Sequence, residues 1–208
     1  MVRVKICGIT NLEDALAAAE EGADAVGFVF YPKSPRYIEP GEAGRISSAL
    51  PPFVARVGVF VDEEFERIVR IARRCRLDYV QLHGSEPPEM CRRLREAGLK
   101  VIKAFRVRDE GSLRGIGEYE ADAYLLDAYA PDRPGGTGLT FRWAVAYNLD
   151  VDRRRLIVAG GLTPENVRDV IEMLRPWAVD VSSGVEIEPG RKDRGKIRRF
   201  IAAVKGGA

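Results

Sequence analysis

Short apolar runs alternate with amphipathic segments eight times along the 208-residue chain. Short apolar runs separated by helical patterns are typical of parallel β-α-β units. Eight such units predict an α/β fold of one domain, a (β/α)8 TIM barrel over residues 1–208, near the lower end of the usual length of this fold. Strands are expected at residues 2–7, 25–30, 55–60, 79–82, 100–105, 123–127, 156–160 and 178–182.

Helical spacing and end signals place helices at residues 11–21, 63–75, 87–98, 163–174 and 192–204. In the fourth of these, Thr163 is the expected N-cap and Pro164 the expected first helical residue. The alternative fold is an open doubly wound sheet, which usually carries a GxGxxG turn after its first strand. This chain has CGIT at that place, so the barrel is favoured.

Charge and cysteine content limit the classes of partner and compartment. The chain has 33 basic and 31 acidic residues, and we see no basic face that predicts nucleic acid or an anionic membrane as a partner. The basic stretch 191–199 is interpreted as the solvated face of the last helix. Three scattered cysteines favour a reducing compartment, and Arg3 and Lys5 interrupt any signal peptide. No apolar run approaches the roughly 18 residues of a membrane span, so we expect a cytoplasmic protein.

The first strand ends with an amine and a thiol on one face. Lys5 and Cys7 are two residues apart, so both side chains point the same way from a strand. Reactive groups of barrels lie at the C-terminal ends of strands. A nearby ammonium lowers the pKa of a thiol, so the pair is expected to favour a thiolate. The alternative is a core cysteine beside a lysine that reaches the rim.

Asp127 ends the sixth strand with the inward parity of Leu125, which suggests an acid at the barrel mouth; a turn or cap residue is the alternative. The loop that follows contains prolines and glycines (Pro131, Pro134, Gly135, Gly136 and Gly138). Such a loop can close over a ligand, although a plain flexible connection would look similar.

Glycine turns follow the last two strands. Gly160 and Gly161 come after the seventh strand, and Ser183 and Gly184 come after the eighth. Barrels commonly bind phosphate at these two loops, where backbone amides and helix N-termini face an anion. Together the two turns predict a phosphorylated ligand.

Two further polar residues lie in loops at the same end. Arg36 is held between Pro35 and Tyr37 after the second strand, and its guanidinium could grip a carboxylate; a surface arginine is the alternative. His83, the only histidine, follows the fourth strand and could contact the ligand or be structural. With no metal cluster and no dinucleotide fingerprint, the set predicts proton transfer in a phosphosugar without metal or cofactor.

The ordered motifs are similar to those of one enzyme family. KICGIT, GFVFYPKSPRYI, VGVFV, VQLHG, LLDA with GGTG, AGGLTPENV and DVSSGVE with PGRKD follow one another along nearly the whole chain. In this order they resemble the phosphoribosylanthranilate isomerases of tryptophan biosynthesis. The resemblance implies an Amadori rearrangement of the small molecule N-(5-phosphoribosyl)anthranilate to 1-(2-carboxyphenylamino)-1-deoxyribulose 5-phosphate.

The resemblance also implies roles for single residues. Asp127 matches the general acid that protonates the furanose oxygen, and Cys7 matches the general base that takes the C2 proton. Arg36 matches the residue that binds the anthranilate carboxylate. The amides around Gly160, Gly161, Ser183 and Gly184 match the phosphate site, and the role of His83 stays open. From charge alone, Lys5 is expected to bias Cys7 toward thiolate. Arg142 departs from the acidic or amide residue that is common at its place.

Three other functions remain open at this point. Indole-glycerol-phosphate synthase would need a catalytic lysine and glutamate at other strand ends. A dual-substrate isomerase of the histidine and tryptophan pathways would need paired aspartates and two phosphate sites. A non-catalytic sensor of a phosphorylated metabolite would keep the glycine turns without needing both Cys7 and Asp127. Monomer and homodimer are both left open.

Overall fold

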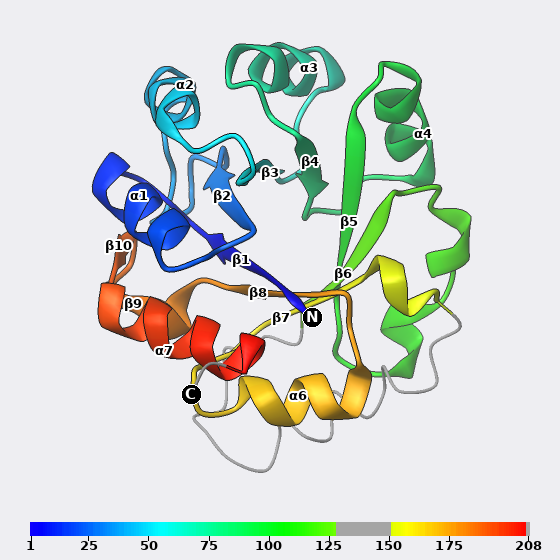
Figure 1. Cartoon of the computed structure of the whole chain (residues 1–208). Helices are drawn as coiled ribbons and strands as arrows, with labels where there is room; N and C mark the ends of the chain where they lie inside the picture. The colour runs from blue at the N-terminus through cyan, green and yellow to red at the C-terminus, as the bar shows by residue number, and fades with distance from the viewer. Residues whose placement is uncertain (128–150, 207–208) are drawn as a thin grey trace.

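Eight parallel strands close into a barrel in the computed structural model, which describes residues 1–127 and 151–206 (Figure 1). Each strand agrees with its predicted range to within one residue at either end, so the predicted barrel is confirmed. The strands are β1 (Arg3–Cys7), β2 (Ala25–Val29), β3 (Ala55–Phe60), β4 (Tyr79–Leu82), β5 (Lys100–Arg106), β6 (Ala123–Asp127), β7 (Leu156–Ala159) and β8 (Ala178–Val181).

Helices follow one another around the outside of the barrel in Figure 1. They are α1 (Leu12–Glu20), α2 (Pro40–Ala49), α3 (Phe65–Arg74), α4 (Pro88–Glu96), α6 (Val167–Leu174) and α7 (Arg194–Lys205). Their buried faces and the outward faces of the strands form the larger of two apolar clusters. The sequence reasoning did not identify α2, although Pro40 at its start and Ala43, Ile46 and Ser47 on its buried side carry the helical signal.

One predicted helix differs from the structure at its start. The helix expected from Thr163 begins at Val167, because the amide side chain of Asn166 accepts from the Thr163 amide and closes a tight turn before the helix. No helix was predicted between β5 and β6, and the structure has two short 3₁₀ turns there (Glu110–Leu113 and Ile116–Glu118). Three glycines in this stretch, at positions 111, 115 and 117, make a longer helix unfavourable.

The barrel interior changes from apolar to polar toward the mouth. Small apolar side chains, including Ala25, Ala104 and Leu125, fill the lower interior. Above them, Lys5, Gln81 and Asp180 are buried polar residues on β1, β4 and β8. Lys5 is paired in register with Asp180 where β1 and β8 close the barrel. The strand ends therefore present a polar floor to any ligand in the mouth.

An antiparallel hairpin separates β8 from α7. After a 3₁₀ turn (Ser183–Val185), β9 (Glu186–Glu188) pairs with β10 (Arg191–Lys192). The predicted solvated helix face at 191–199 is therefore wrong at Lys192, which lies on β10 with only 1% of its side chain exposed. Lys192 lies within a basic run, but the hairpin turns this one lysine inward toward Glu186.

Some predictions fall on residues that the structure does not describe. The Pro- and Gly-rich loop at 131–138 and Arg142 lie outside the described residues. In the part of the chain that is described, no helix is long and apolar enough to span a membrane.

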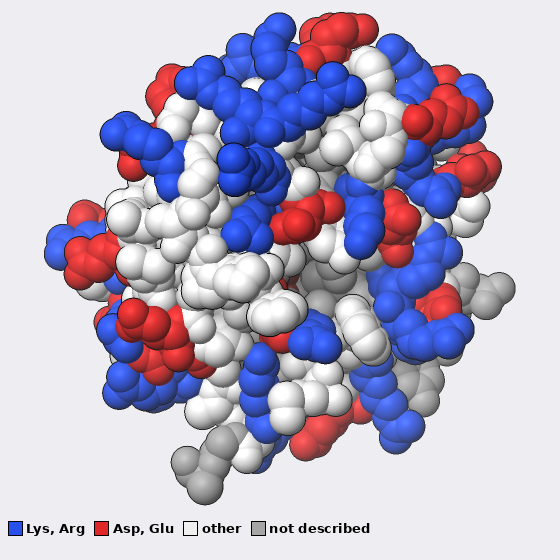
Figure 2. Space-filling view, turned by 45° about the horizontal axis from the view of Figure 1, so that its top comes forward, with Lys and Arg blue, Asp and Glu red and all other residues white. Residues whose placement is uncertain are grey.

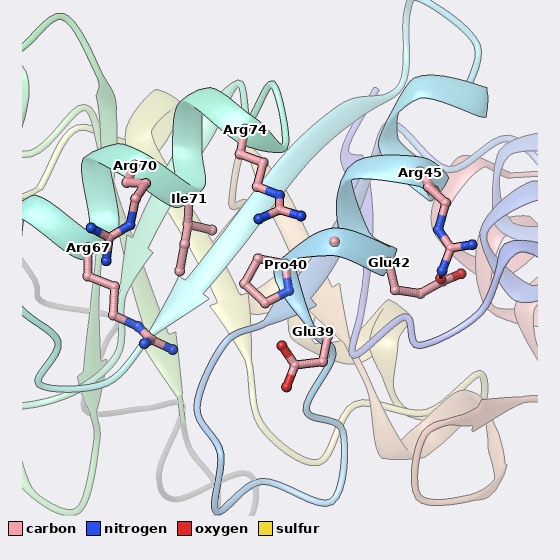
Figure 3. Close-up of a pocket in the computed structure, with 9 residues that line it drawn as sticks. Glu39, Pro40, Glu42, Arg45, Arg67, Arg70, Ile71 and Arg74 are labelled. Carbon is pink, nitrogen blue, oxygen red and sulfur yellow. Dashed lines mark ion pairs between the residues drawn. The ribbon is translucent and has the colours of Figure 1, made fainter.

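An open groove of about 760 Å³ lies on the outer ring between α2 and α3 (Figure 3). Arg67, Arg70 and Arg74 line it from α3, and Arg45 lines it from α2. Basic side chains gather in the upper part of Figure 2, the part of the molecule where α3 lies. The sequence reasoning did not single out this concentration of arginine. None of the predicted site residues lines the groove, so it is separate from the barrel mouth.

Candidate active site

Cys7 and Lys5 lie side by side at the mouth of the barrel, as their spacing predicted. Cys7 is the last residue of β1, is partly exposed, and is paired in register with Gly27 of β2. A Cβ atom at Gly27 would lie 2.8 Å from the Cys7 sulfur and 3.1 Å from Cε of Lys5. Gly27 therefore provides the space that both side chains occupy, a role that the sequence reasoning missed.

The ammonium of Lys5 is held by a buried acceptor pair. Its Nζ donates to Oδ2 of Asp180 and to Oε1 of Gln81, each at 2.9 Å. Burial alone would lower the pKa of Lys5, but the charge of Asp180 and the hydrogen bond to it raise it above its ordinary value. Lys5 is therefore a cation, and Asp180 is its principal counter-charge.

Lys5 acts on Cys7 in the predicted direction, but the net shift of the Cys7 pKa in the resting site is upward. Removal from bulk water raises the pKa of the Cys7 thiol, and the charge of Asp180 raises it further. Lys5 and Lys192 act in the expected direction and lower this pKa, but they do not outweigh the burial. Burial is the largest cause of the upward shift, and the negative charge of Asp180, which pairs with Lys5, adds to it. At rest, Cys7 is a thiol.

Asp127 is joined to the barrel interior through the only histidine of the chain. Nε2 of His83 lies 3.1 Å from Oδ2 of Asp127, and Nδ1 of His83 lies 2.9 Å from Nε2 of Gln81. Both side chains retain about a fifth of their exposure, 20% for His83 and 18% for Asp127. His83 thus contacts the predicted acid directly. This contact gives the position of His83 but does not by itself give its role.

The loop after His83 is fixed by a second buried ion pair. Nζ of Lys103 donates to Oε2 of Glu86 at 2.7 Å and to the carbonyl of Gly84 at 2.8 Å. The other carboxylate oxygen of Glu86 accepts from the amides of Asp62 and Gly84. Because every charge is paired and hydrogen-bonded, this cluster can hold the β4 loop in place without an exposed anchor.

Arg36 crosses the mouth from the β2 loop to the β9–β10 hairpin. Its Nε and Nη2 donate to the two carboxylate oxygens of Glu186, at 2.8 and 2.6 Å. A Cβ atom at Gly8 would lie 2.6 Å from Cδ of Arg36, so the arginine passes directly over the first turn after β1. The predicted carboxylate-binding residue is thus already oriented by one carboxylate of the protein itself.

Lys192 completes this network under the first turn. Its Nζ donates to Oε1 of Glu186 at 2.7 Å and to the carbonyl of Cys7 at 2.5 Å. Burial would raise the pKa of Glu186, but the bonds from Arg36 and Lys192 lower it below its ordinary value. Burial lowers the pKa of Lys192, and the charge of Glu186 only partly reverses that effect. The hairpin is therefore tied to the backbone of Cys7 itself.

The glycine turns after β7 and β8 lie together, as predicted. Gly160 and Gly161 have φ of 92° and 64°, in the left-handed region that favours glycine. A Cβ atom at Gly184 would overlap the carbonyl oxygen of Leu162, so the two turns pack backbone against backbone. Ser183 is exposed beside them. The turn after β8 therefore contacts the segment that directly follows Gly161.

Comparison with known proteins gives one consistent answer. A family model described as N-(5'-phosphoribosyl)anthranilate (PRA) isomerase matches residues 4–203. A crystal structure of phosphoribosyl anthranilate isomerase from Thermotoga maritima is 55% identical, covers 99% of this chain and 100% of its own, and superposes with a TM-score of 0.90.

The chain belongs to the PRA isomerase family. It is an intramolecular isomerase of tryptophan biosynthesis.

Two further PRA isomerase structures bear on ligand and assembly. One is a complex with reduced 1-(o-carboxyphenylamino)-1-deoxyribulose 5-phosphate, 52% identical over 99% of this chain and 100% of that chain, with a TM-score of 0.87. The other contains monomeric forms of the dimeric T. maritima enzyme, 50% identical with the same coverage and a TM-score of 0.86.

The structure brings all the predicted PRA isomerase site residues to the C-terminal end of the barrel, but four partners were missed. Gln81 and Asp180 were detectable, because both are polar residues at inward positions of strands that are otherwise apolar. Glu186 and Lys192 gave no such signal. Among the described residues, no group of three or more His, Cys, Asp or Glu side chains could hold a metal ion.

Proposed function

We propose that Cys7 and Asp127 carry the proton transfers of the Amadori rearrangement of N-(5-phosphoribosyl)anthranilate. Asp127, as the acid, protonates the furanose oxygen; the C1–O bond breaks and leaves a Schiff base between C1 and the anthranilate nitrogen. Cys7, as the thiolate, removes the proton from C2 and gives an enolamine. Protonation of C1 and loss of the proton from the C2 hydroxyl then give the ketone, 1-(2-carboxyphenylamino)-1-deoxyribulose 5-phosphate, with no net oxidation. Each proton transfer contributes about 10²–10⁴-fold to the rate.

The observation that carries this proposal is the pairing of an acid and a thiol at one mouth. Asp127 and Cys7 end β6 and β1, and the glycine turns of β7 and β8 lie between those strands in the barrel order. A phosphosugar whose phosphate lies on the turns would then have its ring between the two groups. A sensor of the same ligand would need the turns but not both proton-transfer groups.

Binding roles follow from the same arrangement. A substrate carboxylate that approaches Arg36 meets a guanidinium whose direction Glu186 has already fixed, so less ordering is needed on binding. The amides around Gly160, Gly161, Ser183 and Gly184 are proposed to hold the phosphate. The buried Oδ1 of Asp180 has no hydrogen-bond partner among the described residues and is proposed to accept from a sugar hydroxyl.

We propose a homodimer over the alternative monomer. The T. maritima isomerase is described as dimeric. In this chain the exposed apolar residues Met1, Phe53 and Trp177 directly precede β1, β3 and β8, which places them on the N-terminal face of the barrel.

We also propose that residues 1–208 act as one domain and that the enzyme is cytoplasmic, since its cysteines are unpaired where the structure describes them.

A fluorescence assay with freshly prepared phosphoribosylanthranilate tests the mechanism. Cys7→Ser and Asp127→Asn are expected to lower kcat by about 10²–10⁴-fold while the fold is retained. Cys75→Ser is the matched control, because the Cys75 sulfur is buried under α2 and bonds only the Pro40 carbonyl at 3.2 Å. Full activity in either variant would refute the assigned role, and substrate binding without turnover in the wild type would favour the sensor.

A further inference from the structure

A continuous hydrogen-bonded chain runs through the barrel from β1 to β6. It links Lys5 to Gln81 at 2.9 Å, Gln81 to His83 at 2.9 Å, and His83 to Asp127 at 3.1 Å. Gln81 is fully buried in the middle of this chain. The direction of each hydrogen bond follows from the Lys5 end of this chain, because the ammonium can only donate. Lys5 therefore decides the orientation of its neighbour.

That member is Lys5. An ammonium has three N–H donors and no acceptor, so the amide atom that faces Nζ must be the oxygen of Gln81. The NH₂ group of the same amide then faces His83, and it can only donate. Nδ1 of His83 must therefore accept, which means that it carries no proton. Rotating the Gln81 amide by half a turn would set NH₂ against the ammonium, so the orientation is fixed rather than chosen.

The proton of the neutral imidazole is consequently on Nε2, the nitrogen that faces Asp127. We propose that Gln81 is a positioning residue for the isomerase reaction, which fixes His83 as the Nε2–H tautomer and so makes it a hydrogen-bond donor to Oδ2 of Asp127. Lys5 fixes Gln81 in turn. The sequence reasoning left the role of His83 open, and this chain of donors supplies it.

The tautomer matters for the proposed acid step. When Asp127 is protonated it has one O–H group, and Oδ2 already accepts from Nε2–H. The acidic proton is thereby directed to Oδ1, so that only one oxygen of the carboxyl can deliver it. The opposite tautomer would present a bare Nε2, which would draw the acidic proton toward the histidine instead of the substrate. This inference rests on the proposed role of Asp127 as the acid.

The same amide also disfavours the opposite tautomer directly. A proton on Nδ1 would point at the NH₂ group of Gln81, two donors face to face.

Nitrogen-15 NMR of histidine-labelled protein tests the tautomer directly. Because the chain has one histidine, an untagged sample gives one imidazole spin system without ambiguity. At neutral pH, without substrate, we expect a protonated Nε2 and an unprotonated Nδ1. A proton on Nδ1 in the wild type would overturn the proposal. The measurement does not involve turnover, so it stands or fails separately from the assigned catalytic roles.

Two variants of Gln81 separate positioning from packing. Gln81→Glu keeps the shape but offers an acceptor to both Lys5 and His83, so Nδ1 is expected to gain a proton and the signal to move to that of an imidazolium. Gln81→Met keeps the volume without any donor and is expected to give a tautomer mixture. Because a small misplacement of a catalytic group can cost about 10²-fold, kcat should fall by roughly 10- to 100-fold with KM little changed.

Tyr79→Phe, on the same strand and one inward position below, is the control and should change neither the tautomer nor kcat. If Gln81→Glu does not fold, Gln81→Met alone decides the question. A Gln81→Met protein that keeps the pure Nε2–H tautomer and wild-type kcat would show that Gln81 only fills space.

Discussion

At the scale of single residues, burial and the nearby lysines shift the pKa of the Cys7 thiol in opposite directions, and the effect of burial is the larger. Its pKa is raised above the ordinary value of 9.0, although Lys5 and Lys192 both act to lower it. A base with a raised pKa is protonated at neutral pH and becomes a thiolate only as the pH rises. In the proposed mechanism, a further positive charge beside Cys7 is therefore needed during turnover to generate the thiolate base.

Alkylation of the resting enzyme measures this directly. We predict that the rate at which iodoacetamide modifies Cys7 increases steadily from about pH 7 to beyond about pH 9 without reaching a plateau below that value, since only the thiolate reacts. Mass spectrometry of the Cys7 peptide gives the rate, and Cys7→Ser identifies the adduct. A rate already maximal near neutrality would show that Lys5 outweighs burial after all.

At the scale of elements, the β9–β10 hairpin holds the binding loop by one carboxylate. Glu186 is 4% exposed and bonds both Arg36 and Lys192, so Glu186→Gln leaves a buried lysine without its counter-charge. Removing one partner of a buried ion pair lowers the free energy of unfolding by about 3–5 kcal/mol. We expect the lower end of this range, because the Arg36 side chain is 23% exposed. Arg36 also loses its fixed direction, so KM should rise about tenfold or more.

The pH dependence of the stability lost in Glu186→Gln shows whether the charge of the carboxylate or the shape of the side chain is responsible. The folded pKa of Glu186 is lowered, so its carboxylate stabilises the fold above the unfolded pKa of about 4.3, and this stability is lost as the pH falls through the folded value. Urea unfolding should therefore show the full deficit of Glu186→Gln at pH 7 and a shrinking one in acid. Glu188→Gln, on the same hairpin with a side chain 65% exposed, is the matched control and should show little change at any pH. An equal deficit at all pH values would mean that the carboxylate charge is not the cause.

The same elements show what a sequence can reveal. The strand ranges were predictable because the signal for each strand, an apolar run bounded by turn-forming residues, lies entirely within neighbouring positions of the sequence. Arg36 and Glu186 lie 150 positions apart, and no local pattern announces that they bond. Lys192 was misinterpreted for the same reason, since a buried lysine and a solvated one look alike until the partner is placed. The positions of Cys7 and Asp127 at the barrel mouth were predictable because strand parity and strand end are local features. The net shift of the Cys7 pKa was not predictable, because it depends on burial and on Asp180 from the far end of the chain.

At the scale of the whole molecule, the barrel has two faces with different tasks. The C-terminal face holds the site, and the N-terminal face carries apolar side chains that directly precede strands. Phe53, in the loop before β3, is 97% exposed. In the proposed homodimer, a two-fold interface over this face would bury this aromatic side chain twice.

The proposed homodimer gives a prediction for that residue. Burying one Phe side chain contributes about 1.5–3 kcal/mol, so Phe53→Ser, which removes two from a symmetric interface, should weaken association by roughly 10²–10⁴-fold. Light scattering during gel filtration should show the wild type as a dimer and the variant as a monomer. Ile187→Ser, 60% exposed on β9 at the opposite face, should remain dimeric. Because the mouth of the barrel lies at the other end, kcat of the Phe53→Ser monomer should stay near that of the wild type, and a wild-type chain that is already monomeric would reject the interface.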